Sequence, residues 1–104
     1  MPKKILQINV KFNVTAEELK DEFKSAASPI SGVQGLKWKI FGMNEDQKEG
    51  AGVYLFENEE SMKSYLDGPI VAAMKEKKAF TDINVKTFDV VEEATAITRG
   101  PVQG

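Results

Sequence analysis

Two aromatic segments in the middle of the chain carry the side chains with the clearest potential for chemistry. The second of them, residues 51–56, reads Ala-Gly-Val-Tyr-Leu-Phe and predicts a strand with Tyr54 and Phe56 on one face. The Tyr54 hydroxyl could donate a hydrogen bond to an oxygen that becomes negative during a reaction, and the Phe56 ring could hold a flat ligand. Tyr54 is therefore a candidate catalytic residue and Phe56 a candidate substrate-binding residue. An ordinary core tyrosine is the competing interpretation.

The first aromatic segment, residues 35–41, reads Gly-Leu-Lys-Trp-Lys-Ile-Phe and predicts a second strand. Alternation groups Trp38 with Leu36 and Ile40 on one face, and Lys39 with Phe41 on the other. Lysine could attract a phenolate, although strand lysines are also typical solvated edge residues, and an indole could stack on a planar ligand. Trp38, Lys39 and Phe41 are candidate substrate-binding residues. Alternation alone does not show which face of this strand lines a cavity, because a one-residue slip in strand pairing exchanges the two faces.

A third candidate lies near the N-terminus, where residues 5–13 alternate between apolar and polar side chains. One face of the predicted strand is apolar, and the other carries Gln7, Asn9 and Lys11. Asn9 could donate a hydrogen bond to a substrate oxygen, which makes it a second candidate catalytic residue. A hydrogen-bonded amide at an interface remains the alternative.

The absence of histidine and cysteine from the sequence narrows the possible chemistry. A disulfide scaffold, a structural zinc site, a thiol nucleophile, a Ser-His-Asp triad and haem held by histidine or thiolate each lose a required part. The adjacent acidic pairs Glu59-Glu60 and Glu92-Glu93 are typical of solvated surface charge rather than a ligand set. The sequence predicts a protein with no metal and no cofactor.

Charge and hydropathy limit the classes of partner and the cellular location that we expect. The net charge of −2, from 14 basic and 16 acidic residues, gives no basic excess for phosphates, so we expect no nucleic-acid partner. No run approaches the roughly 20 apolar residues that a membrane-spanning helix needs. The N-terminal residues alternate instead of forming the continuous apolar core of a signal peptide. These patterns predict a cytoplasmic protein without a membrane association.

The elements that must position these candidates follow from periodicity and capping signals. Thr15 and Glu18 form a capping-box pattern, Ser28-Pro29 and Ser31-Gly32 are expected to end the first helix, and Gly68-Pro69 is expected to break the second. The expected order is a strand at 5–13, a helix from 15, strands at 36–41 and 51–56 joined as a hairpin, a helix from 58 with a second segment at 70–78, and a strand at 81–91. This β-α-β-β-α-β order predicts an α+β, ferredoxin-like fold with an antiparallel sheet. Residues 1–104 form one domain, with 92–104 as a C-terminal tail that could contact a partner.

Both helices of such a fold cover one face of the sheet, so the other face needs a cover. The hairpin brings aromatic residues, and large exposed apolar patches are rare on monomers. The simplest cover is a second copy packed sheet to sheet about a two-fold axis, which predicts a homodimer. If the aliphatic Val53 and Leu55 meet the helices, Tyr54 and Phe56 line a cavity on their opposite face.

The hairpin also carries a family resemblance. Residues 35–41, residues 49–56 (Glu-Gly-Ala-Gly-Val-Tyr-Leu-Phe) and the Ser-x-x-x-Tyr-Leu of residues 61–66 resemble the YdhR-like putative monooxygenases of the dimeric α/β-barrel superfamily. The resemblance implies a dimeric α/β barrel that encloses a pocket in each subunit, between the helices and the dimerised sheets. It further implies cofactor-independent oxygenation of a small aromatic substrate, phenolic or quinone-forming, and it favours Trp38 at the cavity.

Two other functions remain open on the residues alone. The same cavity could belong to a non-catalytic protein that binds small aromatic or apolar molecules, or to a lyase or cyclase. The sequence shows no indispensable nucleophile or base that would separate these alternatives from an oxygenase. Fold resemblance by itself does not fix function.

Overall fold

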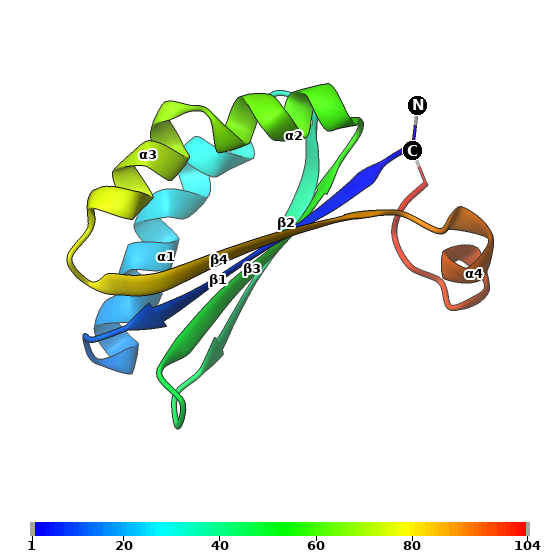
Figure 1. Cartoon of the computed structure of the whole chain (residues 1–104). Coiled ribbons are helices and arrows are strands. Elements are labelled where there is room, and N and C mark those ends of the chain that lie inside the picture. The colour runs from blue at the N-terminus through cyan, green and yellow to red at the C-terminus, as the bar shows by residue number, and fades with distance from the viewer. Residues whose placement is uncertain (1, 104) are drawn as a thin grey trace.

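The computed structural model describes residues 2–103 as four strands and four helices (Figure 1). The order is β1 (Lys4–Phe12), α1 (Ala16–Ser31), β2 (Leu36–Asn44), β3 (Glu49–Phe56), α2 (Glu59–Leu66), α3 (Pro69–Glu76), β4 (Phe80–Asp89) and α4 (Glu92–Ile97). The strands form one antiparallel sheet in the order β2-β3-β1-β4. Helices α1, α2 and α3 lie on one face of it, whereas α4 lies beyond the end of β4 (Figure 1). The predicted α+β, ferredoxin-like fold is confirmed.

Local signals explain the helix boundaries, with one correction. The Thr15 hydroxyl accepts a hydrogen bond from the Glu18 backbone N–H at 3.1 Å, and the Glu18 carboxylate accepts one from the Thr15 N–H at 3.0 Å, so the capping box is present. Of the two expected end signals, Ser31-Gly32 is confirmed and Ser28-Pro29 is wrong, because α1 continues through Pro29 to Ser31 and Gly32 is its C-cap. Proline this close to a C-terminus removes one hydrogen bond of the ladder, and only two helical residues follow it. Gly32 then closes the helix by donating to the Pro29 carbonyl.

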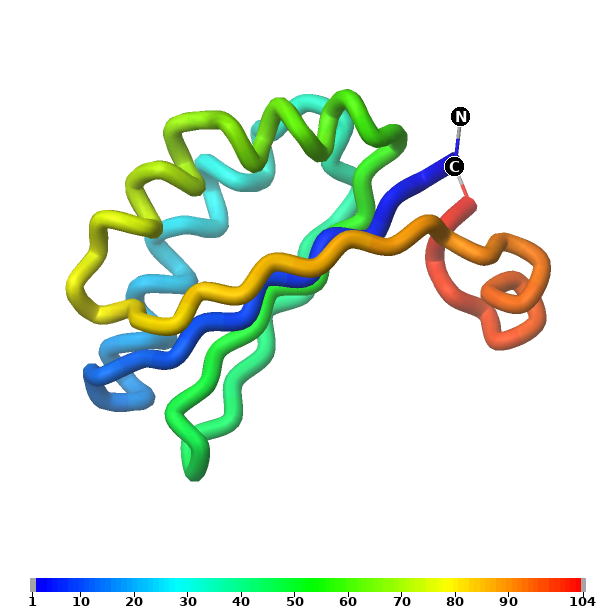
Figure 2. The backbone as a smooth tube through the Cα atoms, viewed as in Figure 1, coloured from blue at the N-terminus to red at the C-terminus, as the bar shows by residue number. Residues whose placement is uncertain are grey.

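The second helical region is split where the sequence predicts. The Asn58 side chain caps α2 by accepting a hydrogen bond from the Ser61 N–H at 2.8 Å. Gly68 precedes α3, and Pro69 occupies its first turn, where a missing N–H costs nothing. The resulting bend lets α2 and α3 follow the length of the sheet (Figure 2). No helix within residues 2–103 is long and apolar enough to cross a membrane.

Strand register decides which side chains meet the helices. Lys39 of β2 and Leu6 of β1 both lie opposite Tyr54 of β3, and Phe41 lies opposite Gly52. These positions belong to the helix-covered face, where the core contains Leu6, Ile8, Val10, Tyr54, Phe56, Met62 and Tyr65. Leu55 pairs with Trp38 on the opposite face. Tyr54 and Phe56 therefore meet the helices, so the condition that Val53 and Leu55 face the helices is not met.

The C-terminal segment folds back toward the face of the sheet that carries no helix. The tail, for which the sequence shows no strong pattern, begins with the short helix α4. Its Pro101 carbonyl accepts a hydrogen bond from the Trp38 indole at 2.8 Å, and Val102 is buried. Several large apolar side chains near this region remain exposed: Ile40, Phe88, Val91 and Ile97. The tail thus covers part of the helix-free face and leaves another part open.

Candidate active site

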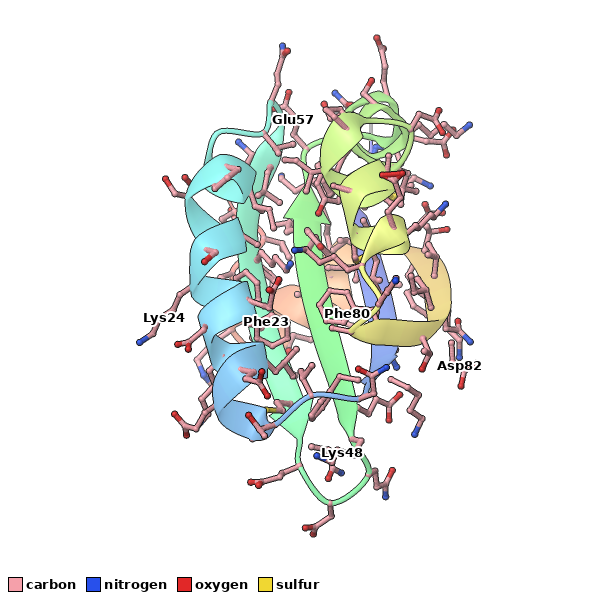
Figure 3. All side chains as sticks on the ribbon, turned by 90° about the vertical axis from the view of Figure 1, so that its left-hand side faces the viewer. Phe23, Lys24, Lys48, Glu57, Phe80 and Asp82 are labelled. Carbon is pink, nitrogen blue, oxygen red and sulfur yellow. The ribbon has the colours of Figure 1, made fainter. Side chains whose placement is uncertain are left out.

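A pocket of about 310 Å³ lies between the helix-covered face of the sheet and helices α1 and α3. Its walls are mostly apolar and include Phe23, Ile30, Ile70, Met74 and Phe80. Figure 3 shows Phe23 of α1 and Phe80 of β4 facing each other across the gap between the helices. The volume lies at the lower end of the range of small-molecule sites, which are typically apolar with a few placed polar groups.

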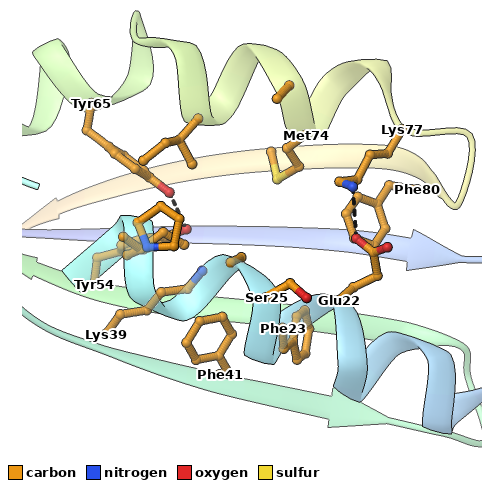
Figure 4. A pocket seen from close by; sticks show the side chains of 15 residues that line it. Glu22, Phe23, Ser25, Lys39, Phe41, Tyr54, Tyr65, Met74, Lys77 and Phe80 are labelled. Carbon is orange, nitrogen blue, oxygen red and sulfur yellow. Dashed lines mark hydrogen bonds and ion pairs between the residues drawn. The ribbon is translucent and has the colours of Figure 1, made fainter. Parts of the chain in front are cut away.

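Two tyrosine hydroxyls meet at the inner end of this pocket (Figure 4). The oxygens of Tyr54 on β3 and Tyr65 on α2 are 2.9 Å apart, and both side chains are buried. One hydroxyl donates to the other, so one O–H of the pair is left to donate elsewhere. Burial raises the pKa of Tyr54, and the neighbouring Tyr65 raises it further. Burial likewise raises the pKa of Tyr65, so both phenols stay protonated and serve as neutral donors.

A lysine amine lies beside the tyrosine pair. The Lys39 nitrogen is 3.9 Å from the centroid of the Phe41 ring and 4.5 Å from that of Tyr54. Among residues 2–103, no carboxylate lies within ion-pair distance of this nitrogen. Burial lowers the pKa of Lys39 to about 8, because the two rings compensate only part of the hydration that the ammonium loses. The pocket therefore holds a lysine that changes charge close to neutral pH.

The solvent-exposed end of the pocket is bridged by one ion pair. Glu22 of α1 and Lys77, the C-cap residue of α3, approach to 2.9 Å, and both line the pocket (Figure 4). Both side chains are well exposed, so the pair adds little to stability. It nevertheless connects the two helices that form the walls.

The pocket brings together some of the residues that the sequence singles out. Tyr54, Lys39 and Phe41 all line it. Phe56 is fully buried on the same face and stacks near Tyr54 at 6.0 Å between ring centroids, so it supports the pocket from behind. A substrate-binding role for Phe56 stays a prediction, as do the roles of the other candidates in the chemistry.

Asn9 and Trp38 lie elsewhere, on the helix-free face. The Asn9 amide donates to the Glu49 carboxylate at 3.4 Å and accepts from Gln7 at 3.3 Å. The Trp38 indole is bonded to the tail through Pro101. Neither residue lines the pocket beneath the helices, and their predicted roles would need a site on the opposite face of the sheet.

Sequence reasoning missed Tyr65, Glu22 and Lys77. Tyr65 lies at helical spacing from Met62 and therefore has the pattern of ordinary core filler. Its hydroxyl was the available signal, because a buried tyrosine oxygen usually has a hydrogen-bond partner. The identity of that partner depends on how α2 docks on β3, which the sequence does not show.

The arrangement can bind one oxygen anion in an apolar surrounding. The free tyrosine O–H supplies a neutral donor, and the protonated Lys39 amine supplies a positive charge. Both are worth more in an apolar pocket than in water, because less solvent competes for the anion. Within residues 2–103, no group of three or more carboxylates gathers into a site that could hold a metal ion.

The fold and the pocket define a class: a ferredoxin-like α+β protein with an apolar cavity between sheet and helices. Comparison with protein families then gives the family. The model of the family described as "Putative mono-oxygenase ydhR" matches residues 5–101, so the chain belongs to that family. The resemblance predicted from the hairpin and the helix that follows it is confirmed. A search of the curated proteins found no match.

Solved structures share the fold at low sequence identity. NE2512, a protein of unknown function from Nitrosomonas europaea, is 18% identical with a TM-score of 0.73, covering 88% of this chain and 91% of that one. SnoaB, a cofactor-independent oxygenase from Streptomyces nogalater, is 10% identical with a TM-score of 0.71 (86% and 94% covered). A putative antibiotic biosynthesis monooxygenase from Deinococcus radiodurans is 16% identical with a TM-score of 0.66 (84% and 91% covered). At these identities the likeness establishes the fold alone.

Proposed function

We propose that the protein is a cofactor-independent monooxygenase that acts on a small aromatic substrate, phenolic or quinone-forming, in the pocket beneath α1 and α3. Membership of the mono-oxygenase family supports the class of reaction. The observation that carries the proposal is that an apolar pocket contains both a lysine without a carboxylate partner and two protonated tyrosines. Such a surrounding stabilises an electron-rich aromatic anion, and the anion can give electrons to oxygen.

The proposed reaction balances without a cofactor. In an anthrone-like substrate, a ring CH₂ becomes a carbonyl: one atom of O₂ forms the new C=O bond and the other leaves as water with the two hydrogens. The substrate supplies the electrons, and O₂ is the oxidant. The protein binds the ring and limits access of water. Lys39 and the tyrosine pair stabilise the negative charge of the deprotonated substrate.

We further propose that two copies associate through their helix-free faces. Ile40 and Phe88 are 58% and 49% exposed there, which is unusual for side chains of this size on a monomer's sheet. Asn9 and Trp38 would then lie at or near the interface, together with the tail. Light scattering should give twice the 11.5 kDa of one chain, and a stable monomer at micromolar concentration would contradict the dimer and with it the barrel.

Oxygen consumption tests the oxygenase directly. Purified protein should consume O₂ with at least one member of a panel of dihydroxyphenols and anthrone-like compounds, with one O₂ consumed per carbonyl formed. Catalase should leave the stoichiometry unchanged, because the second oxygen atom leaves as water and not as peroxide. Saturable binding of panel members without oxygen consumption would instead favour a non-catalytic binding protein. Conversion of a panel member without O₂ would favour a lyase or cyclase.

A further inference from the structure

The proposed reaction needs a base to deprotonate the substrate. The sequence alone does not identify one, but the pocket contains one. Resting on the proposed function, we propose that the neutral amine of Lys39 accepts the proton of the substrate, so that the substrate enters as an uncharged phenol or enol and is ionised inside the pocket. The O–H bond of the substrate breaks and an N–H bond forms on Lys39. No electrons are transferred in this step. It leaves an ammonium beside an aromatic oxygen anion.

The surroundings of Lys39 favour a proton acceptor over a permanent cation. The amine nitrogen lies over two aromatic rings, and no carboxylate within residues 2–103 forms an ion pair with it. An ammonium without a counter-ion in an apolar pocket is costly, and the cost disappears when the amine is neutral. A bound phenolate would supply the missing counter-ion. Transfer of the proton therefore creates the ion pair that the empty pocket lacks.

The other titratable groups around the pocket have different tasks. Tyr54 on β3 and Tyr65 on α2 hold their protons more tightly than usual because their pKa values are raised, so they donate hydrogen bonds and do not act as bases. Glu22 on α1 forms an ion pair with Lys77, the C-cap residue of α3, at the exposed end. Of these five groups, Lys39 alone combines a position inside the pocket with a pKa near the working range of a general base, about 8.

Gly52 gives the lysine its position. A Cβ atom at this residue would lie 2.7 Å from Cε and 3.3 Å from Nζ of Lys39, closer than real Cβ atoms come to the first of these. The lysine stem therefore passes over Gly52 to reach the pocket, and any other residue there must displace it. The Cβ would also lie 3.1 Å from Cε1 of Tyr54, a contact that a shift of a few tenths of an ångström relieves. Because the closest obstructing atom belongs to the end of the flexible Lys39 side chain, Gly52→Ala should move the amine and leave the strand in place. This variant displaces the base without changing its chemistry.

The ionisation step can be measured without oxygen, with 2-naphthol as the probe, because its neutral and ionised forms have different absorption spectra. Under anaerobic conditions at pH 8–9, naphthol bound to the wild type should show the spectrum of the anion. Naphthol bound to Lys39→Met should show the neutral spectrum, and Gly52→Ala should show at least a several-fold smaller anion band. Circular dichroism checks that the variants are folded. A neutral spectrum in the wild type would overturn the proposal.

Proton counting separates a proton acceptor from a fixed positive charge. Lys39→Arg keeps a cation that does not lose its proton in this range. Calorimetry in buffers of different ionisation enthalpy should show that naphthol binding at pH 9 releases few protons from the wild type, because the neutral amine takes up the naphthol proton. Lys39→Arg should release close to one. Equal proton release from the two proteins would overturn the assignment of Lys39 as acceptor.

These measurements stand apart from the test of the oxygenase. An anion spectrum with matching proton counts, but no oxygen consumption on any aromatic, would keep the role of Lys39 and reject the monooxygenase. Oxygen consumption with a neutral bound probe would do the reverse.

Discussion

The two faces of the sheet are built from the same strands, yet they give the same residue types different chemistry. Lys37 and Lys39 stand two residues apart on β2. Lys37 is exposed and lies 3.9 Å from the Glu57 carboxylate, whereas Lys39 is enclosed by aromatic rings and has a lowered pKa. The acid–base chemistry of a lysine in this sheet therefore depends on the surroundings of its side chain and not on the residue type alone.

The polar groups of the two faces differ in the same way. On the helix-free face, Gln7, Asn9 and Glu49 bond to one another and remain partly exposed, so their hydrogen-bonding capacity is shared among themselves and solvent. On the helix-covered face, the hydroxyls of Tyr54 and Tyr65 are buried and one O–H is left for a ligand. We therefore expect substitutions on the helix-covered face to change ligand binding and turnover more than substitutions on the helix-free face.

The largest effect should come from the tyrosine pair. Tyr54→Phe should lower turnover of a working substrate by roughly 10²-fold or more, as for a lost oxyanion donor, while the secondary structure stays unchanged. Tyr65→Phe is the matched variant: it keeps the O–H of Tyr54, whose ring centroid lies 4.5 Å from the Lys39 nitrogen and therefore beside the expected anion, and it should retain more activity. Initial rates at saturating substrate measure both. Wild-type turnover in both variants would return the pair to a purely structural role.

The two lysines should differ in how they affect stability with pH. Lys39 has a folded-state pKa below its unfolded value, so the unfolded chain binds more protons between about pH 8 and 10.5, and the free energy of unfolding should rise across that range. Above about pH 10 the protonated tyrosines oppose this rise. Lys39→Met should remove the rise and stabilise the protein at pH 7 by roughly 1–3 kcal/mol. Urea titrations at several pH values measure it.

Lys37→Met is the control for this comparison. Its ion pair with Glu57 is exposed, so the change should alter stability by no more than about 0.5 kcal/mol at any of these pH values. If both variants shifted stability alike, the contrast between the two faces would fail.

The next effect concerns the helix-free face. Trp38→Phe removes the bond to Pro101 and should cost about 1 kcal/mol of stability through a loosened tail. If the site lies beneath the helices, ligand binding in the wild type should leave the fluorescence of Trp38 nearly unchanged, and Asn9→Ala should leave ligand affinity unchanged. Saturable quenching of Trp38, or a ten-fold loss of affinity in Asn9→Ala, would instead move the site to the helix-free face.

The smallest effect should come from the ion pair at the exposed end of the pocket. Lys77→Ala frees α3 from Glu22 and should raise the association rate of naphthol by no more than a few-fold, with stability changed by about 0.5 kcal/mol or less. Lys20→Ala, which removes an exposed pair within α1, is the control and should leave the rate unchanged. Stopped-flow absorbance measures both. A slower association in Lys77→Ala would show that the pair attracts the ligand and does not restrict it.

The element order, the helix caps and the apolar face of β1 can all be predicted from local sequence signals. These features depend on neighbours within a few residues: Thr15 with Glu18, Gly68 with Pro69, and the alternation from Leu6 onward. Tyr54, Lys39 and Phe41 could also be singled out, because aromatic and charged residues on a strand are visible without a structure. Their partners were not visible.

The side of β2 that faces the helices, in contrast, depends on how β2 pairs with β3 and cannot be predicted from local signals. Parity groups Leu36 with Trp38, but a bulge between them gives β2 one more residue than β3, so Leu36 packs against the core while Trp38 pairs with Leu55 on the other face. A single inserted residue reverses every later side chain of the strand. The meeting of Tyr54 with Tyr65 and the enclosure of Lys39 likewise depend on how distant segments pack, and packing is what shifts their pKa values.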